Sequence, residues 1–89
     1  MRKTKVLKSL QEMDRRNLKL PMAVIYQKPK DYPDDYVVRI FEGTTGRPTE
    51  MVILRKTLEE CRKEVLEAGF YVALPRAAAD DPVIVESWI

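Results

Sequence analysis

Three stretches in the first two thirds of the chain are rich in apolar and β-branched residues, and each is too short for a helix. They cover residues 22–28, 36–42 and 50–56. The gaps between them contain turn-forming residues, namely Pro29, Asp31, Pro33, Asp34, Asp35, Gly43, Gly46 and Pro48. Short apolar runs with such boundaries are typical of β-strands. We therefore predict three strands, of which the first two form a hairpin with a long connection.

The periodicity becomes helical after residue 57. One face of the expected helix carries Leu58, Cys61, Val65 and Ala68. Thr57 and Glu60 have the spacing of a capping box directly before this pattern. Gly69 supplies the left-handed residue at which helices often end. These signals predict a helix over residues 58–68.

Two further strands are expected after this helix, over residues 70–74 and 83–88, with a loop over residues 75–82. Near the start of the chain, a narrow apolar stripe consists of Val6, Leu7, Leu10 and Met13. This spacing indicates a short amphipathic helix from Thr4 to Asn17, although its basic first turn opposes the helix dipole. Pro21 then ends the segment.

The element order predicts an α+β fold. It consists of a mainly antiparallel sheet of four to five strands with one helix packed on a face, plus a basic N-terminal helix. We expect a basic amphipathic arm over residues 1–21 and an α+β domain over residues 22–89. A start of the natural chain at Met22 is the alternative, because Met22 stands directly before the first strand. The predicted core contains Val24, Val38, Ile40, Ile53, Leu58, Cys61, Val65, Val72 and Val85.

Charge is distributed unevenly along the chain. The formal net charge is +2, yet residues 1–20 hold seven Lys or Arg residues against two acids. A basic arm on a mildly acidic body suggests that the two parts have different roles. The candidate contacts to nucleic acid or to a partner are Arg2, Lys3, Lys5, Lys8, Arg15, Arg16 and Lys19. We expect the arm to dock on a partner, so that deletion of residues 1–19 leaves the stability of the body nearly unchanged.

The sequence offers little catalytic chemistry. It contains no histidine and a single cysteine, Cys61, which lies on the apolar helix face and is expected to be a small buried hydrophobe. We therefore predict no catalytic residue, no metal site and no cofactor. One cysteine allows no intramolecular disulfide, which favours a reducing compartment and a cytoplasmic location. No apolar stretch approaches the roughly 20 residues that span a bilayer, so no membrane association is expected.

Three other features have an ordinary and a functional interpretation. The carboxylates of Asp31, Asp34, Asp35, Asp80 and Asp81 fit solvated turns, and weak divalent-ion binding is the alternative. The segment 43–47 is a glycine-punctuated connection between strands, since it lacks the ending of a phosphate loop. The aromatic residues suit packing within a sheet, and stacking on single-stranded nucleic acid is the alternative.

Two short segments resemble the HicB-like antitoxins. Residues 35–39, with the sequence Asp-Tyr-Val-Val-Arg, are similar to the second strand of that family, and residues 57–60, with the sequence Thr-Leu-Glu-Glu, are similar to its helix start. The resemblance implies a partial RNase-H-type body of three strands, a helix and a further strand that binds another macromolecule and is not an enzyme. The segments 20–33 and 81–88 also resemble a group of small uncharacterised bacterial proteins.

The sequence therefore favours a non-catalytic binding module that engages a protein partner or a second copy of itself, of the HicB-like antitoxin type if the resemblance holds. Nucleic-acid binding through the basic N-terminal arm is the alternative. An enzyme or a small-ligand carrier is the remaining class.

Overall fold

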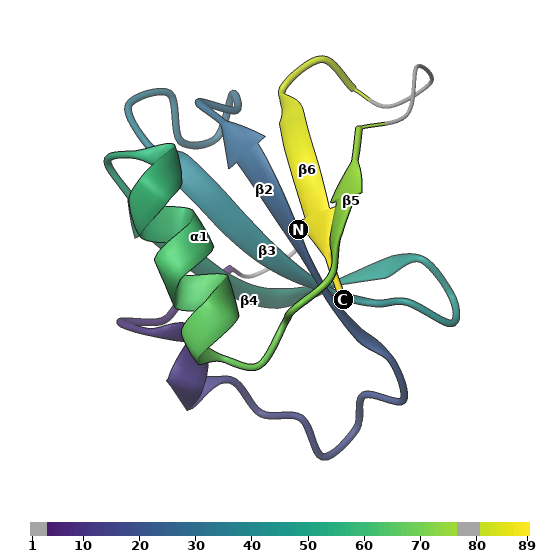
Figure 1. Ribbon diagram of the computed structural model, residues 1–89. Coiled ribbons are helices and arrows are strands. Elements are labelled where there is room, and N and C mark those ends of the chain that lie inside the picture. Colours follow the sequence, from purple (N-terminus) through teal and green to yellow (C-terminus); the bar gives the residue numbers. More distant parts are fainter. Residues whose placement is uncertain (1–3, 77–80) are drawn as a thin grey trace.

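The computed structural model of the chain describes residues 4–76 and 81–89, which form one mixed β-sheet with a helix across one of its faces (Figure 1). In chain order, the elements are β1 (Lys5–Val6), a 3₁₀ turn η1 (Leu10–Glu12), β2 (Pro21–Gln27), β3 (Tyr36–Glu42), β4 (Arg47–Arg55), α1 (Leu58–Glu67), β5 (Ala73–Pro75) and β6 (Ile84–Trp88). The six strands are ordered β1-β4-β3-β2-β6-β5. β1 lies parallel to β4, and every other neighbouring pair is antiparallel.

The predicted strands at the centre of the sheet are confirmed, and β2 lies one residue before its predicted range of 22–28. β3 has the predicted bounds, whereas β4 begins at Arg47, before the predicted start at residue 50. The connection between them is a tight turn in which Gly46 adopts a positive φ of 71°. Pro48 is tolerated in β4 because, among the described residues, β1 pairs with Met51 and Val52 and leaves β4 at the sheet edge near Pro48.

The helix signals of the sequence are also confirmed. Thr57 is the N-cap of α1, and its hydroxyl oxygen accepts a hydrogen bond of 3.1 Å from the backbone N–H of Glu60. α1 ends at Glu67, one residue before the predicted end, and Gly69 follows with a φ of 96°. Local capping chemistry therefore defines both ends of this helix.

The core lies between α1 and the sheet. Its buried members are Leu7, Leu10, Met13, Ala23, Ile25, Val38, Ile40, Ile53, Cys61, Val65, Phe70 and Trp88. Five of the predicted core residues are among them, and Leu58 and Val85 pack against them in part. Val24 is buried but lies outside this cluster. The prediction for Val72 is wrong: its side chain is 52% exposed, because Val72 lies at the edge of the sheet, directly before β5.

The predicted N-terminal helix from Thr4 to Asn17 is not formed. The segment instead contains β1 and the single turn η1, and it runs beside α1 before it enters β2 (Figure 1). Leu7, Leu10 and Met13 of the apolar stripe enter the core of the chain itself, whereas Val6 is exposed. An isolated helix of this length is only marginally stable in water, so tertiary contacts decide the conformation.

Two carboxylates and one guanidinium hold this segment through its backbone. Glu64 of α1 accepts hydrogen bonds from the Leu10 backbone N–H and the Ser9 hydroxyl, each at 3.0 Å. Glu42 of β3 accepts the backbone N–H groups of Lys19 and Leu20 at 2.7 and 3.1 Å. Arg55 donates to the Lys8 carbonyl at 2.6 Å. The segment is thereby attached to α1, β3 and β4.

These hydrogen bonds change the acidity of both carboxyls. Hydrogen bonds from the Thr44 hydroxyl and from the backbone N–H groups of Leu20 and Thr44 lower the pKa of Glu42 to about 2. Burial by itself would raise the pKa of Glu64, but the hydrogen bonds from Leu10, Ser9 and Arg55 outweigh burial and lower that pKa. The docked N-terminal segment therefore favours the ionised form of both carboxyls.

No helix of the described part of the chain is long and apolar enough to cross a membrane.

Candidate functional site

The face of the sheet opposite α1 is the main candidate surface. Side chains alternate along a strand, so a residue that directly precedes or follows a core residue in the sequence has its side chain on the face opposite α1. On β2, β3 and β4 these residues are Met22, Val24, Tyr26, Val37, Arg39, Phe41, Val52 and Leu54. We call this surface the helix-free face, because neither α1 nor η1 of the described residues lies on it.

The helix-free face has an unusual composition for a sheet with one layer of helix. An antiparallel sheet that exposes one face to water normally alternates apolar and polar residues. Here the middle parts of β2, β3 and β4, which are residues 22–26, 36–41 and 51–54, are apolar on both faces, and Arg39 is the exception. Strands that are apolar on both sides are typical of sheets covered on both faces.

One row of side chains crosses the whole helix-free face. The strand register places Leu74, Ser87, Val24, Arg39, Val52 and Val6 side by side in that order, from β5 to β1. The two ends of the row are exposed apolar residues, with Leu74 39% and Val6 52% exposed. Neighbouring strands lie about 4.8 Å apart, so the row is about 24 Å long. Between these ends Val24 and Val52 are already buried, so the apolar side chains of the row are open to water mainly at the two edges of the sheet.

Arg39 occupies the centre of this row and of β3. Its guanidinium pairs with Asp31 from the β2–β3 connection at 3.4 Å, and the side chains of Arg39 and Asp31 are 14% and 56% exposed. Charge-assisted hydrogen bonds of this type are usually about 2.7 to 2.9 Å long, so the pair is loose. Among the described residues, Asp31 is the one carboxylate that contacts Arg39, which leaves guanidinium donors for a further acceptor.

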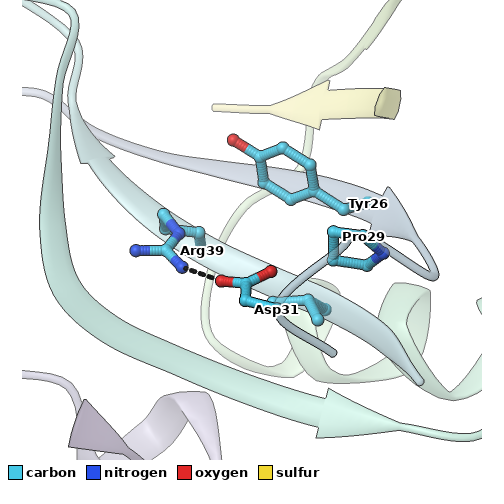
Figure 2. A pocket seen from close by; sticks show the side chains of 5 residues that line it. Tyr26, Pro29, Asp31 and Arg39 are labelled. Carbon is cyan, nitrogen blue, oxygen red and sulfur yellow. Dashed lines mark hydrogen bonds and ion pairs between the residues drawn. The ribbon is translucent and has the colours of Figure 1, made fainter. Parts of the chain in front are cut away.

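A small pocket accompanies the ion pair. It has a volume of about 130 Å³ and is lined by Tyr26, Pro29, Asp31, Val37 and Arg39. Figure 2 shows the Tyr26 ring and Pro29 bordering the Arg39–Asp31 pair. Sites for small-molecule ligands usually measure about 300 to 1,000 Å³. The pocket suits a single side chain from a partner better than a substrate or cofactor.

The structure distributes the predicted basic site residues along the N-terminal segment. Arg2 and Lys3 lie outside the described residues. Lys5 is exposed on β1, and the backbone carbonyl of Lys8 is bound by Arg55. The backbone N–H of Lys19 is bound by Glu42. None of these backbone contacts restrains the ammonium groups.

The two described arginines of this segment have structural contacts. Arg15 lies over the Phe70 ring, 5.2 Å from its centroid, and donates to the carbonyl of Ala68 at the end of α1. Arg16 forms a 3.0 Å ion pair with Asp14, and this contact lowers the pKa of Asp14 to about 2. Their charges are therefore partly engaged before any phosphate approaches.

Cys61 is confirmed as a buried apolar residue. Its side chain is fully buried in the core between α1 and the sheet. Burial raises the pKa of the thiol to about 12, so the thiolate is almost absent at neutral pH. Since the thiolate is the nucleophilic form, this cysteine is inert in the folded chain.

The aspartates of the first turn cluster separate in the fold. Asp31 pairs with Arg39, and Asp35 pairs with Lys56 at 2.7 Å. Asp81 accepts the backbone N–H of Val83, as expected of a turn residue, and Asp80 lies outside the described residues. No three His, Cys, Asp or Glu side chains within residues 4–76 and 81–89 form a group that would hold a metal ion.

Sequence reasoning did not single out Arg39 or its pocket. One signal was present, because Arg39 is the single charge in the otherwise apolar run from Tyr36 to Phe41. Asp31, eight residues earlier, gave no comparable signal, since it looked like any other turn aspartate.

Comparison with protein-family models, with curated proteins and with solved structures gave no match to this chain.

Proposed function

We propose that this chain is a non-catalytic binding module that engages a protein through the helix-free face. The observation that carries the proposal is the composition of residues 22–26, 36–41 and 51–54, which are apolar on both faces apart from Arg39, although α1 covers only one face. Apolar surface gains about 25 cal/mol for each Å² removed from water. A protein layer on the helix-free face would supply that gain at Val6 and Leu74, whereas Val24, Val37 and Val52 are already buried in the single chain.

The centre of the face has the composition of a protein interface. Tyrosine and arginine are enriched among the residues that contribute most to binding, and charged residues are otherwise rare at interface centres. Tyr26 and Arg39 line the central pocket, with apolar neighbours Val24 and Val52 on either side of Arg39. This arrangement favours a partner that inserts one side chain beside Arg39.

Other functions have weaker support. The buried thiol of Cys61 does not suit nucleophilic catalysis, and the pocket is small for a substrate. Nucleic-acid binding through the basic N-terminal segment stays a prediction, and the contacts of Arg15 and Arg16 give it no support. An antitoxin of the HicB-like type also stays a prediction that rests on the resemblance alone.

The test compares lysine substitutions on and off the face. The double variant Val6→Lys, Leu74→Lys places charges at both ends of the apolar row, whereas Leu66→Lys alters an equally exposed leucine on α1. The full chain is immobilised, and the proteins that it retains from a cell lysate are identified. Sedimentation measures self-association of the same chain. We expect association that the double variant abolishes and Leu66→Lys preserves. Association that survives the double variant would contradict the proposed surface.

A further inference from the structure

We propose that the outer edge of β5 binds an extended segment of a partner protein, which adds to the sheet as a further strand beside Ala73 and Pro75. β5 is the last strand in the sheet order, and no described strand pairs with its outer side (Figure 1). This inference deepens the proposed function and rests on it, because Leu74 of β5 is one exposed end of the row that crosses the helix-free face. It states how a partner is held at that end.

The backbone of β5 has polar groups that point away from the sheet. Val72 and Ile89 exchange both backbone hydrogen bonds, at 3.0 and 2.9 Å, and the register places Leu74 in the next such pair with β6. Backbone groups alternate in direction along an antiparallel strand, so the N–H and C=O of Ala73 and the C=O of Pro75 point outward from β5. One donor and two acceptors therefore have the spacing of a strand ladder, which matches another extended backbone.

Exposed apolar side chains lie beside these backbone groups. By alternation along β5 and β6, Val72, Leu74 and Ile89 share the helix-free side of the edge. Their side chains are 52%, 39% and 39% exposed, whereas Val24 and Val52 in the middle of the face are buried. Contiguous exposed apolar side chains mark sites of contact with other molecules. The partner segment would place alternate apolar side chains against Val72 and Leu74.

The opposite edge of the sheet suits strand addition less well. β1 has only two residues, Lys5 and Val6, and it pairs with β4 at Met51 and Val52. Charged side chains, lysine especially, are a common device against the pairing of sheet edges. Residues 71–75, by contrast, are all exposed, and none of them is charged. The observations therefore favour the edge at β5.

A different protein fits this edge better than a second copy of the chain does. An incoming strand can form two hydrogen bonds with Ala73 and a third with the Pro75 carbonyl, although Pro75 itself has no N–H to donate. If a second copy paired its β5 antiparallel to this one, only two would form. Pro75 supplies no donor, and the Tyr71 N–H is already bound to the Ile89 carbonyl at 3.1 Å. The partner is therefore a segment with free N–H groups along the edge that faces β5.

Backbone methylation of a probe peptide tests strand addition. The probe is an acetylated and amidated peptide of sequence Lys-Val-Thr-Val-Thr-Val-Lys, whose valines lie on one face when it is extended. Valines placed beside Val72 and Leu74 bring the threonine N–H groups to the edge of β5. N-methylation of both threonines should raise the dissociation constant by a factor of about 10 or more, whereas N-methylation of two valines should leave it nearly unchanged. Amide resonances of the ¹⁵N-labelled full chain measure binding, and the Ala73 amide should shift most.

Variants of the chain test the same contact from the other side. Ala73→Pro removes the outward N–H without loss of a hydrogen bond to β6, and it should weaken binding of the probe by a factor of about 10. Pro75→Ala supplies an outward N–H and should tighten binding by a factor of about 2 to 10. Pro48→Ala changes a proline of β4 and is the matched control that should leave binding unchanged. If thermal melting shows that Ala73→Pro does not fold, the comparison of Pro75→Ala with Pro48→Ala still decides.

The outcomes separate this inference from the proposed function. A probe that does not bind at millimolar concentration overturns strand addition, and so do equal dissociation constants for the threonine-methylated and valine-methylated probes. If a protein binds the chain, Val6→Lys, Leu74→Lys abolishes that binding and a folded Ala73→Pro preserves it, the proposed function stands and strand addition is rejected. Binding that is lost on threonine methylation, kept on valine methylation and tightened by Pro75→Ala supports the inference.

Discussion

Replacement of Leu10 by alanine tests whether the N-terminal segment belongs to the folded core. The Leu10 side chain is fully buried against the core cluster, although it comes from a turn of only three residues. The substitution removes this side chain and leaves the hydrogen bond from the Leu10 backbone to Glu64 in place. It therefore measures packing with little change to the backbone contacts.

The expected loss is large relative to the stability of the chain. Substitution of a fully buried leucine by alanine costs about 2 to 5 kcal/mol, because apolar contacts are lost and a cavity remains. A chain of 89 residues has a free energy of unfolding of about 4 to 13 kcal/mol. Leu10→Ala should therefore remove a substantial fraction of the total. With a urea dependence of about 1 to 1.5 kcal/mol per molar, a loss of about 3 kcal/mol lowers the unfolding midpoint by about 2 to 3 M.

Urea unfolding followed by circular dichroism measures this loss. Leu66→Ala is the matched control, because the same atoms are removed from a side chain that is 44% exposed on α1. The control should unfold within about 0.5 kcal/mol of the parent, as is usual for surface substitutions. Equal midpoints for Leu10→Ala and Leu66→Ala would refute the docked position of the segment.

A truncation extends the same argument. The charge distribution alone led us to expect that deletion of residues 1–19 would leave the body nearly as stable. The buried positions of Leu7, Leu10 and Met13 lead to the opposite expectation. The melting temperature of the truncated chain should fall clearly, and an unchanged value would support a partner-docking arm.

Three further predictions concern single contacts. Thr57→Ala should lower the free energy of unfolding by about 1 kcal/mol through loss of the α1 N-cap, and an unchanged urea midpoint would contradict the cap. Gly43→Ala should destabilise the fold by about 1 to 3 kcal/mol, since its Cβ would lie 2.9 Å from the Leu20 carbonyl oxygen; a thermal melt of the variant tests this close approach. The folded chain lowers the pKa of Glu64 below its ordinary value of 4.5, so this contribution to stability is present above about pH 4.5 and is lost as the pH falls through the lower pKa of the folded state. Urea midpoints should therefore fall on acidification, and Glu64→Gln should show a smaller fall than the parent.

The elements that could be predicted from the sequence are those whose signals are local. β3 agrees with its predicted bounds because an apolar run lies between two groups of turn formers. α1 agrees within one residue because Thr57 and Gly69 cap it directly. Such signals act over a few residues, so the rest of the fold does not alter them.

The N-terminal segment shows the limit of this approach. Its apolar spacing suggested a helix, but the stripe was too short to stabilise one without other contacts. Glu64 is separated from Leu10 by more than fifty residues along the chain, yet its carboxylate binds the Leu10 backbone and Ser9. A contact at this separation leaves no local mark in the sequence. Of the predicted stripe, Leu7, Leu10 and Met13 are buried, whereas Val6 is 52% exposed on β1.

The features of the candidate site also separate into those that the sequence determines and those that only the tertiary structure decides. The sequence by itself determined that β2, β3 and β4 are apolar and that Arg39 is the single charge within its run, because composition is fixed along the chain. Only the tertiary structure decided that α1 covers one face, that Leu74 and Val6 lie in one row with Arg39, and that Asp31 reaches its guanidinium. The physical reason is that strand order and register depend on non-local pairing, in which backbone hydrogen bonds carry no information about residue identity.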